Sequence, residues 1–227
     1  MTSTPEVQLS IRYIGEEKQP LVILDGYSGV ADKLHAQGCQ AQFQQAGAFY
    51  PGLRAPSRPD LIDMQRKLVT GILEQVFGLR QEIVLEMLAY ALVTTPRDEL
   101  APMQSIPHYD HSGDNVVAGM FYMLGKEAGG TAFYRHRETG FETITQGREA
   151  AYRAAVVEEL RNDGSPAGYY HGDGDHYEML EEVESRPDRL ILYRGNLLHS
   201  GVIPQTASLS RNPALGRLTM NMFFRGQ

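Results

Sequence analysis

Short apolar segments separated by glycine-rich turns fill the second half of the chain, and this feature constrains the fold most. They lie at 115–124, 131–135, 189–194, 199–203 and 216–225. Each segment has the length of one strand. Many short strands with Gly and Pro between them are typical of β-sandwiches and β-barrels. We therefore expect a mainly β core over about residues 105–225.

The first half of the chain mixes strands and helices, so the fold class is α+β with β predominant. Alternation of apolar and polar residues at 7–14, and an apolar run at 21–25, predict two strands. Apolar residues spaced three or four apart predict an amphipathic helix over 59–77. A shorter helix is expected to begin at Ser28 and to end at Gly38.

Other segments are less regular. Residues 83–94 are too uniformly apolar for their period to distinguish a strand from a helix, and the β-rich segments after them favour a strand. Three prolines and a glycine within 50–59 predict an ordered or extended loop. Residues 147–161 have a helical composition, and 13 of the 28 acidic residues lie between 138 and 189. We expect about 144–188 to form a solvated, partly helical insertion that acts as a lid.

Length and charge limit the classes of protein that this chain can represent. Its 227 residues suffice for one large domain, and we expect a single domain over 1–227. The net charge of −7 argues against a nucleic-acid partner. No segment approaches the run of about 20 apolar residues that spans a membrane, and the polar first residues lack a signal-peptide pattern. A cytoplasmic protein is expected, and an apolar edge strand could support a homodimer.

The segment P-H-Y-D-H (107–111) carries the most informative polar residues. Alternate residues of a strand share a face, so His108 and Asp110 point the same way. They supply two ligands of a 2-His-1-carboxylate triad, which suits ferrous iron and leaves coordination positions open. His199, in L-L-H-S-G-V, is the best candidate for the third ligand. The alternatives are a surface His and a solvated Asp in the first segment, and a hydrogen-bonded core histidine at 199.

Arg217 opens the last predicted strand, G-R-L-T-M-N-M-F-F, and shares a face with Thr219. A guanidinium at the head of an apolar strand is unfavourable unless it meets an anion or reaches solvent. A dicarboxylate would supply that anion through the bidentate geometry that arginine favours. The pattern therefore favours an anion site beside the metal site, with solvent exposure of Arg217 as the alternative.

Taken together, these motifs resemble the 2-oxoglutarate and Fe(II)-dependent oxygenases, especially the prolyl-4-hydroxylase-like branch. The resemblance is carried by the order H-x-D, then G-G-T-A-F, then H-S-G, then R-x-T, and covers about residues 105–225. The segment Y-P-G-L-R-A-P (50–56) also resembles a family of uncharacterised bacterial proteins assigned to this superfamily. The resemblance implies a double-stranded β-helix, the jelly roll of cupin-like proteins.

The resemblance also implies roles for single residues. His108, Asp110 and His199 would bind Fe(II), and Arg217 would bind the distal carboxylate of the co-substrate 2-oxoglutarate. Tyr122 and Thr219 would assist Arg217, although Tyr122 could equally be a core aromatic. The separation of 18 positions between His199 and Arg217 is longer than usual in this branch. The loop between them must therefore bulge out; otherwise Arg211 takes the place of Arg217.

The remaining histidines are expected to have ordinary roles. His111 points away from the face shared by the triad. The segment H-G-D-G-D-H (171–176) could bind a second cation but lacks a complete calcium-loop pattern, so a flexible acidic loop is preferred. His35 and His136 are expected at the surface.

The functional hypothesis is a dioxygenase that uses dioxygen and 2-oxoglutarate to hydroxylate an amino acid, a peptide or protein side chain, or another small metabolite. Two alternatives stay open. A cupin-like metal-binding or ligand-binding protein would keep the triad without 2-oxoglutarate turnover, and Arg217 would then have no role. A structural β-domain would bind no metal.

Overall fold

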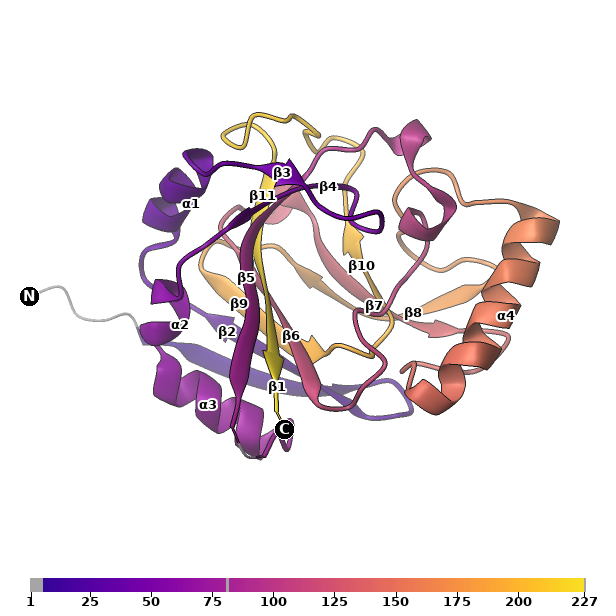
Figure 1. The fold of residues 1–227 in the computed structure, drawn as a ribbon, viewed down its shortest axis with the longest axis horizontal. Coiled ribbons are helices and arrows are strands. Elements are labelled where there is room, and N and C mark those ends of the chain that lie inside the picture. The colour runs from indigo at the N-terminus through magenta and orange to yellow at the C-terminus, as the bar shows by residue number, and fades with distance from the viewer. Residues whose placement is uncertain (1–5, 81, 227) are drawn as a thin grey trace, which may run out of the picture.

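The computed structural model describes residues 6–80 and 82–226, in which eleven strands form two antiparallel sheets (Figure 1). The large sheet has the order β1-β2-β9-β6-β11-β5-β4-β3, and the small sheet has the order β10-β7-β8. The large-sheet strands are β1 (Gln8–Ile14), β2 (Gln19–Asp25), β3 (Gln44–Gln45), β4 (Gly52–Pro56), β5 (Val84–Val93), β6 (Val116–Tyr122), β9 (Arg189–Arg194) and β11 (Arg217–Arg225). The small-sheet strands are β7 (Gly130–His136), β8 (Tyr177–Glu184) and β10 (His199–Val202). The fold is mainly β, with the jelly-roll core that the sequence predicts.

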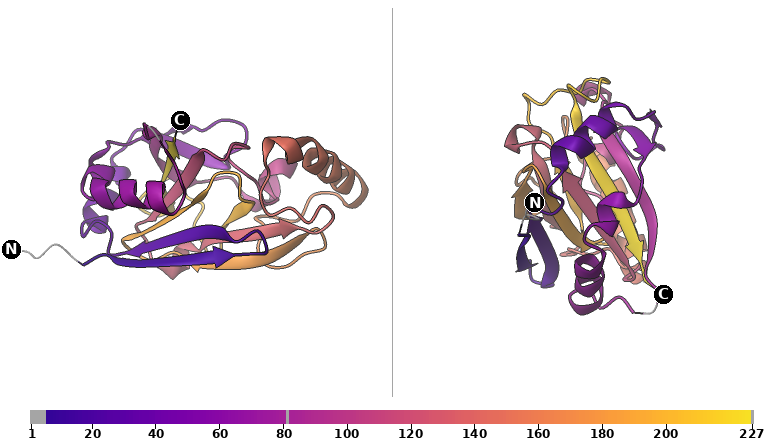
Figure 2. Two further views of the ribbon diagram at one scale, coloured as in Figure 1. Left: turned by 90° about the horizontal axis from the view of Figure 1, so that it is seen from below. Right: turned by 90° about the vertical axis from the view of Figure 1, so that its left-hand side faces the viewer.

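Helices cover both outer faces of this core. They are α1 (Ala31–Cys39), α2 (Asp60–Asp63), α3 (Arg66–Gln75) and α4 (Gln146–Asp163), with short 3-10 turns at Arg97–Glu99, Pro102–Gln104 and Lys126–Ala128. Figure 1 shows α1, α2 and α3 on one side of the molecule and α4 on the opposite side. The long β1–β2 hairpin runs from the α3 side toward α4 (Figure 2). None of the helices within 6–80 and 82–226 combines the length and the apolar character that crossing a membrane requires.

Alternation along the strands sorts side chains into the space between the sheets and the space under the helices. Tyr122 of β6 and Phe133 of β7 belong to one buried cluster, so the two sheets pack face to face there. The rings of Phe133 and Tyr193 of β9 meet edge to face with centroids 5.0 Å apart. Ala132 and Tyr134, on the other face of β7, pack with Tyr152 of α4. The space between the sheets is where the candidate site lies.

Most predicted elements are present, including the strand at 83–94 (β5) and the helix at 147–161 (α4). The single helix expected over 59–77 is wrong, because α2 and α3 are separated near Gln65, whose φ of −127° and ψ of 29° are not helical. Met64 is 46% exposed, so one of the apolar residues that suggested a continuous buried face does not face the core.

The expectation of a loop throughout 50–59 is also wrong, because residues 52–56 form β4 and pair with β5. Pro51 lies just before the strand and Pro56 at its end, where a missing N–H removes little of the hydrogen-bond ladder. Gly52 allows the close approach, since a Cβ there would lie 2.1 Å from the carbonyl oxygen of Leu92.

The segment at about 144–188 contains more than a solvated insertion. Its first part is α4, and residues 177–184 form β8, which pairs with β7 in the small sheet. Acidic residues concealed this strand from pattern analysis. β8 lies at the edge of its sheet, where charged side chains reach water and oppose pairing with other chains.

Candidate metal and co-substrate site

The structure brings His108, Asp110 and His199 together at one end of the space between the sheets. His108 forms an isolated antiparallel bridge with His199, the first residue of β10, and the two exchange backbone N–H···O hydrogen bonds of 2.8 Å. The backbone N–H of Asp110 donates to the carbonyl oxygen of Gly195 at 2.8 Å. One potential ligand atom from each of the three side chains lies within 4.8 Å of the others. The H-x-D segment and the start of β10 therefore position all three groups.

The hydrogen bonds of His199 fix which ring nitrogen faces this space. Nδ1 lies 2.8 Å from the carbonyl oxygen of Leu197, to which only an N–H can donate. Nε2 is therefore the unprotonated nitrogen in the neutral ring, and it lies 3.4 Å from Asp110 Oδ2. His108 Nε2 lies 3.9 Å from Asp110 Oδ1. A carbonyl that orients the ring through its other nitrogen is the usual support of a metal-binding histidine.

Burial favours the protonation state that binds a metal. Loss of hydration around His199, which is 4% exposed, lowers its pKa to about 4. Burial raises the pKa of Asp110 from its ordinary value, and the nearby His108 and Arg54 oppose that rise. The buried His199 imidazole is thus neutral near pH 7, as metal ligation requires. Two neutral imidazole nitrogens and one carboxylate form the donor set that suits Fe(II).

Arg217 begins β11, is buried, and points into the same space. Its Nε donates to the carbonyl oxygen of Ala128 at 2.7 Å, and its Nη2 donates to that of Gly130 at 2.9 Å. Within the described ranges, Nη1 makes no hydrogen bond and no carboxylate lies within ion-pair distance of the guanidinium. Two carbonyls therefore hold the group in place while its positive charge stays without an anion, which is unfavourable unless a ligand supplies one.

Tyr122 and Thr219 flank Arg217 on the same face of the sheet. The two residues are register partners on β6 and β11, and both are buried. The Tyr122 hydroxyl lies 2.7 Å from Thr131 Oγ1, and burial raises the pKa of Tyr122 to about 12, so the phenol is neutral at pH 7. Arg211 is exposed in the loop between β10 and β11, outside this space.

The other histidines are held by contacts of their own. His111 Nδ1 accepts a hydrogen bond from the backbone N–H of Gly113 at 2.9 Å. In the loop at 171–176, His171 pairs with Glu182 of β8, whereas His176 lies 3.1 Å from Asp163 and 3.4 Å from Glu159 of α4.

The expectation that His136 lies at the surface is wrong. The residue is 0% exposed, and its Nε2 lies 2.9 Å from Glu159 Oε1. It ends β7 on the face that α4 covers, so the helix shields it from water. The sequence hid this contact because α4 returns to β7 from a distant part of the chain.

Helix α4 supports the segment that carries His108 and Asp110. The hydroxyl of Tyr152 donates to the carbonyl oxygen of Pro107 at 3.3 Å, and that of Tyr109 donates to Glu149 Oε1 at 2.9 Å. Each of these hydrogen bonds joins the helix to a residue adjacent to His108.

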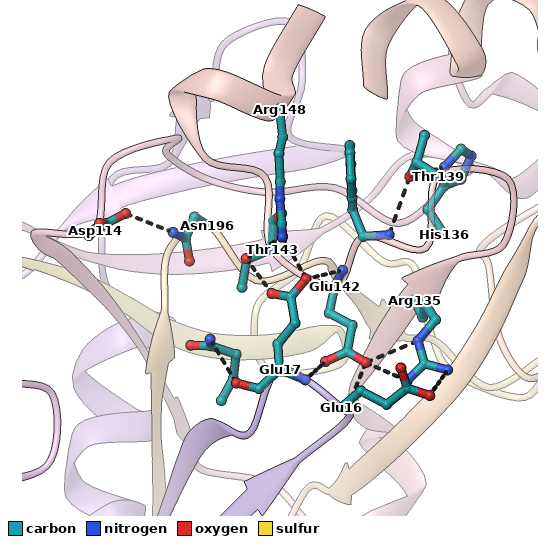
Figure 3. A network of polar contacts seen from close by, with 12 residues as sticks. Glu16, Glu17, Asp114, Arg135, His136, Thr139, Glu142, Thr143, Arg148 and Asn196 are labelled. Atoms are coloured by element: carbon teal, nitrogen blue, oxygen red, sulfur yellow. Dashed lines mark hydrogen bonds and ion pairs between the residues drawn. The ribbon is translucent and has the colours of Figure 1, made fainter. Parts of the chain in front are cut away.

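A buried carboxylate network lies behind β10 (Figure 3). The backbone N–H of Leu198 donates to the carbonyl oxygen of Glu142 at 2.8 Å, which ties this network to the residue before His199. The Glu142 side chain is 1% exposed and accepts hydrogen bonds from Arg135 and from the backbone N–H groups of Glu16 and Glu17. The tip of the β1–β2 hairpin is thereby fixed to the segment that runs beside β10.

Sequence reasoning missed Arg54 of β4, which faces the same space. The ladders align Arg54 with Ala91, then Ala91 with Thr219, and Thr219 with Tyr122, so the row shares one face of the large sheet. In the sequence, Arg54 stands between the apolar residues Leu53 and Ala55, which are buried on the other face of the strand. This alternation of apolar and polar residues could have predicted a strand with Arg54 on one face. The surrounding prolines obscured it by suggesting a loop.

Comparison with solved structures identifies the fold. HygX from Streptomyces hygroscopicus, solved with nickel and 2-oxoglutarate bound, matches with a TM-score of 0.50 and 16% identity over 93% of this chain and 84% of HygX. The epimerase SnoN, solved in complex with Fe3+, alpha ketoglutarate and nogalamycin RO, matches with a TM-score of 0.53 and 12% identity over 92% of this chain and 80% of SnoN. At such identities the comparison shows a shared jelly-roll fold.

The class of protein is therefore a jelly-roll protein that gathers two histidines and one aspartate between its sheets. A family model described as a family of unknown function (DUF6445) matches residues 5–224, and the chain belongs to this family. A search of curated protein sequences finds no significant match.

Proposed function

We propose that this protein is an Fe(II)- and 2-oxoglutarate-dependent dioxygenase that hydroxylates a small molecule or an amino-acid or peptide side chain. The observation that carries the proposal is the pairing of two features in one space. One is a 2-His-1-carboxylate donor set, and the other is a buried Arg217 whose charge has no anion in the described part of the chain. HygX and SnoN, which share the fold, were solved with 2-oxoglutarate (alpha ketoglutarate) bound.

In this proposal, His108, Asp110 and His199 hold the iron from one side and leave its other positions open. The bound iron, together with 2-oxoglutarate and dioxygen, supplies the oxidising chemistry. The hydrogen bond from His199 Nδ1 to the carbonyl of Leu197 keeps Nε2 directed at the metal. Arg217 uses Nη1 to bind the distal carboxylate of 2-oxoglutarate, while its other nitrogens remain on two backbone carbonyls.

Aromatic side chains keep the inner side of the site dry. The ring of Tyr193 lies 4.8 Å from that of His199, and the ring of Phe133 lies 6.4 Å away. Both aromatic side chains are buried between the sheets. Exclusion of water there strengthens the electrostatic contacts of the ligands and limits side reactions. The outer side carries His108, whose side chain is 49% exposed, and this is the direction from which a substrate would approach.

The alternative is a cupin-like metal-binding or ligand-binding protein without 2-oxoglutarate turnover. It accounts for the triad but assigns no role to Arg217. Binding of 2-oxoglutarate that depends on Arg217 therefore separates the two hypotheses.

The test is an anaerobic titration of the Fe(II)-loaded protein with 2-oxoglutarate, followed through the visible charge-transfer band of a chelated 2-oxo acid. We expect the band in the wild type and a weakening of co-substrate affinity by about tenfold or more in Arg217→Gln, because a charge-assisted hydrogen bond is lost. Arg211→Gln is the matched control, since it removes an exposed arginine from the adjacent loop, and its titration should match the wild type. An iron-loaded wild type without the band would contradict the proposed function.

A further inference from the structure

Arg54 carries a positive charge that no group in the described ranges of the chain neutralises. Among the residues that the structure describes, its one hydrogen-bond acceptor is the sulfur of Met87, 3.9 Å from Nη1. Its Nε is buried and has no hydrogen-bond partner. No carboxylate within 6–80 and 82–226 lies at ion-pair distance from it, although the chain has 28 acidic residues. A buried donor without a partner is rare in proteins and requires an explanation.

The sheet register directs this side chain toward the candidate site. Arg54, Ala91, Thr219 and Tyr122 form one row across β4, β5, β11 and β6, and Tyr122 packs between the two sheets. Arg54 therefore points to the inner side of the jelly roll. On β5, Met87, Ala89 and Ala91 share this face, and two of these three side chains are small.

A contact with an aromatic ring holds the guanidinium in place. The Arg54 guanidinium carbon lies 4.5 Å from the centre of the Tyr50 ring, in a cation–π contact. The ring contact and the sheet register together place the guanidinium on the inner side of the jelly roll, the side that also carries Thr219 and Tyr122.

We propose that Arg54 binds an oxyanion, a carboxylate or a phosphate, on the primary substrate. The inference rests on the proposed function, in that the triad and Arg217 form the iron and co-substrate site. β5 separates β4, which carries Arg54, from β11, which carries Arg217. The Cα of Arg54 is therefore about 10 Å from β11. One arginine suffices for the distal carboxylate of 2-oxoglutarate, and Arg217 has the free nitrogen for it. Arg54, which faces the same side of the large sheet as Arg217 and also has no carboxylate partner in the described residues, therefore serves a second anion, and the substrate is a small organic acid or phosphate ester.

The experiment measures binding rather than turnover. The protein is loaded with Zn(II), saturated with 2-oxoglutarate, and titrated with phenylacetate, phenyl phosphate and the uncharged phenylacetamide, with ligand NMR signals as the readout. We expect at least one of the two anions to bind about tenfold or more tightly than the amide, and this preference to disappear in Arg54→Gln. The stronger of the two anions identifies the source of the oxyanion.

Two control variants make the result specific. Arg66→Gln removes an exposed arginine of α3 that pairs with Asp63, and it should leave anion binding unchanged. Arg54→Lys keeps the charge but loses the planar fork, so it should bind the anion with intermediate affinity. Circular dichroism melting of each variant verifies that the fold is retained.

Three results would overturn the proposal. The anions could bind no better than the amide, or bind equally well to wild type and Arg54→Gln. Alternatively, Arg54→Gln could lose 2-oxoglutarate affinity to the same extent as Arg217→Gln, which would place Arg54 in the co-substrate site. If the wild type does not bind 2-oxoglutarate at all, the proposed function fails. The anion titration without co-substrate, compared between Arg54→Gln and Arg217→Gln, still decides the role of Arg54.

Discussion

Replacement of Glu142 by Gln tests whether the buried network behind β10 supports this region of the fold. The carboxylate is 1% exposed and accepts four N–H donors at 2.6–3.0 Å, two from Arg135 and one each from the backbones of Glu16 and Glu17. A glutamine amide presents N–H groups to some of these donors and leaves Arg135 without its buried partner. Loss of one member of a buried ion pair destabilises a protein by about 3–5 kcal/mol.

The expected change is large enough to measure by thermal and urea unfolding. For a chain of this length, 1 kcal/mol corresponds to about 2–4 °C in Tm, so Glu142→Gln should lower Tm by about 6–20 °C. Glu178→Gln is the matched control, because Glu178 pairs with the same arginine at 3.1 Å but is 39% exposed. An exposed pair contributes about 0–1 kcal/mol. Equal destabilisation by the two variants would refute the reasoning, since burial would then not distinguish the two carboxylates.

Two further predictions concern β4 and the histidine ligands. Gly52→Ala places a Cβ 2.1 Å from the carbonyl oxygen of Leu92, so thermal unfolding should show a free energy of unfolding lower by about 1–3 kcal/mol. In the control Gly47→Ala the new Cβ meets nothing within 4 Å, so the free energy of unfolding should change little. Equal melting of the two variants would mean that β4 does not pack as closely on β5 as described. His199 has a pKa of about 4 in the metal-free fold and one of about 6.5 when unfolded, so only the unfolded chain binds its proton between these values. The free energy of unfolding of the wild type, measured with urea, should therefore fall by up to about 3 kcal/mol more than that of His199→Gln as pH falls from 6.5 to 4. An equal fall in the two proteins would contradict a neutral, buried His199.

Much of the fold follows from the period of the sequence, because a strand buried on one face alternates and a buried strand is uniformly apolar. The runs after 115 were identified on that basis, and β6, β7, β9, β10 and β11 lie there, whereas the strand at 83–94 (β5) was favoured only by the β-rich segments that follow it. β4 and β8 were missed for opposite reasons. Prolines at the ends of β4 suggested a loop, and glutamates on the edge strand β8 suggested a solvated insertion.

The candidate site was predictable where local geometry decides and unpredictable where distant segments meet. The two-residue spacing predicted that His108 and Asp110 act together, although the structure forms an isolated bridge at His108 and a bend at Asp110 in place of the expected strand. The structure brings His199 beside them through a cross-strand bridge, and that bridge has no local signal. Arg54 was missed because its role depends on the register of β4 with β5, and His136 because α4 covers it.

Calorimetric titration of the metal-free protein with Fe(II) under anaerobic conditions tests the central claim most directly. The account predicts one equivalent bound by the wild type, and loss of most of that affinity in each of His108→Ala, Asp110→Ala and His199→Ala. His171→Ala, which changes an exposed histidine paired with Glu182, is the control and should bind like the wild type. A wild type that binds no Fe(II), or a triad variant that binds it as tightly as the control, would contradict the account.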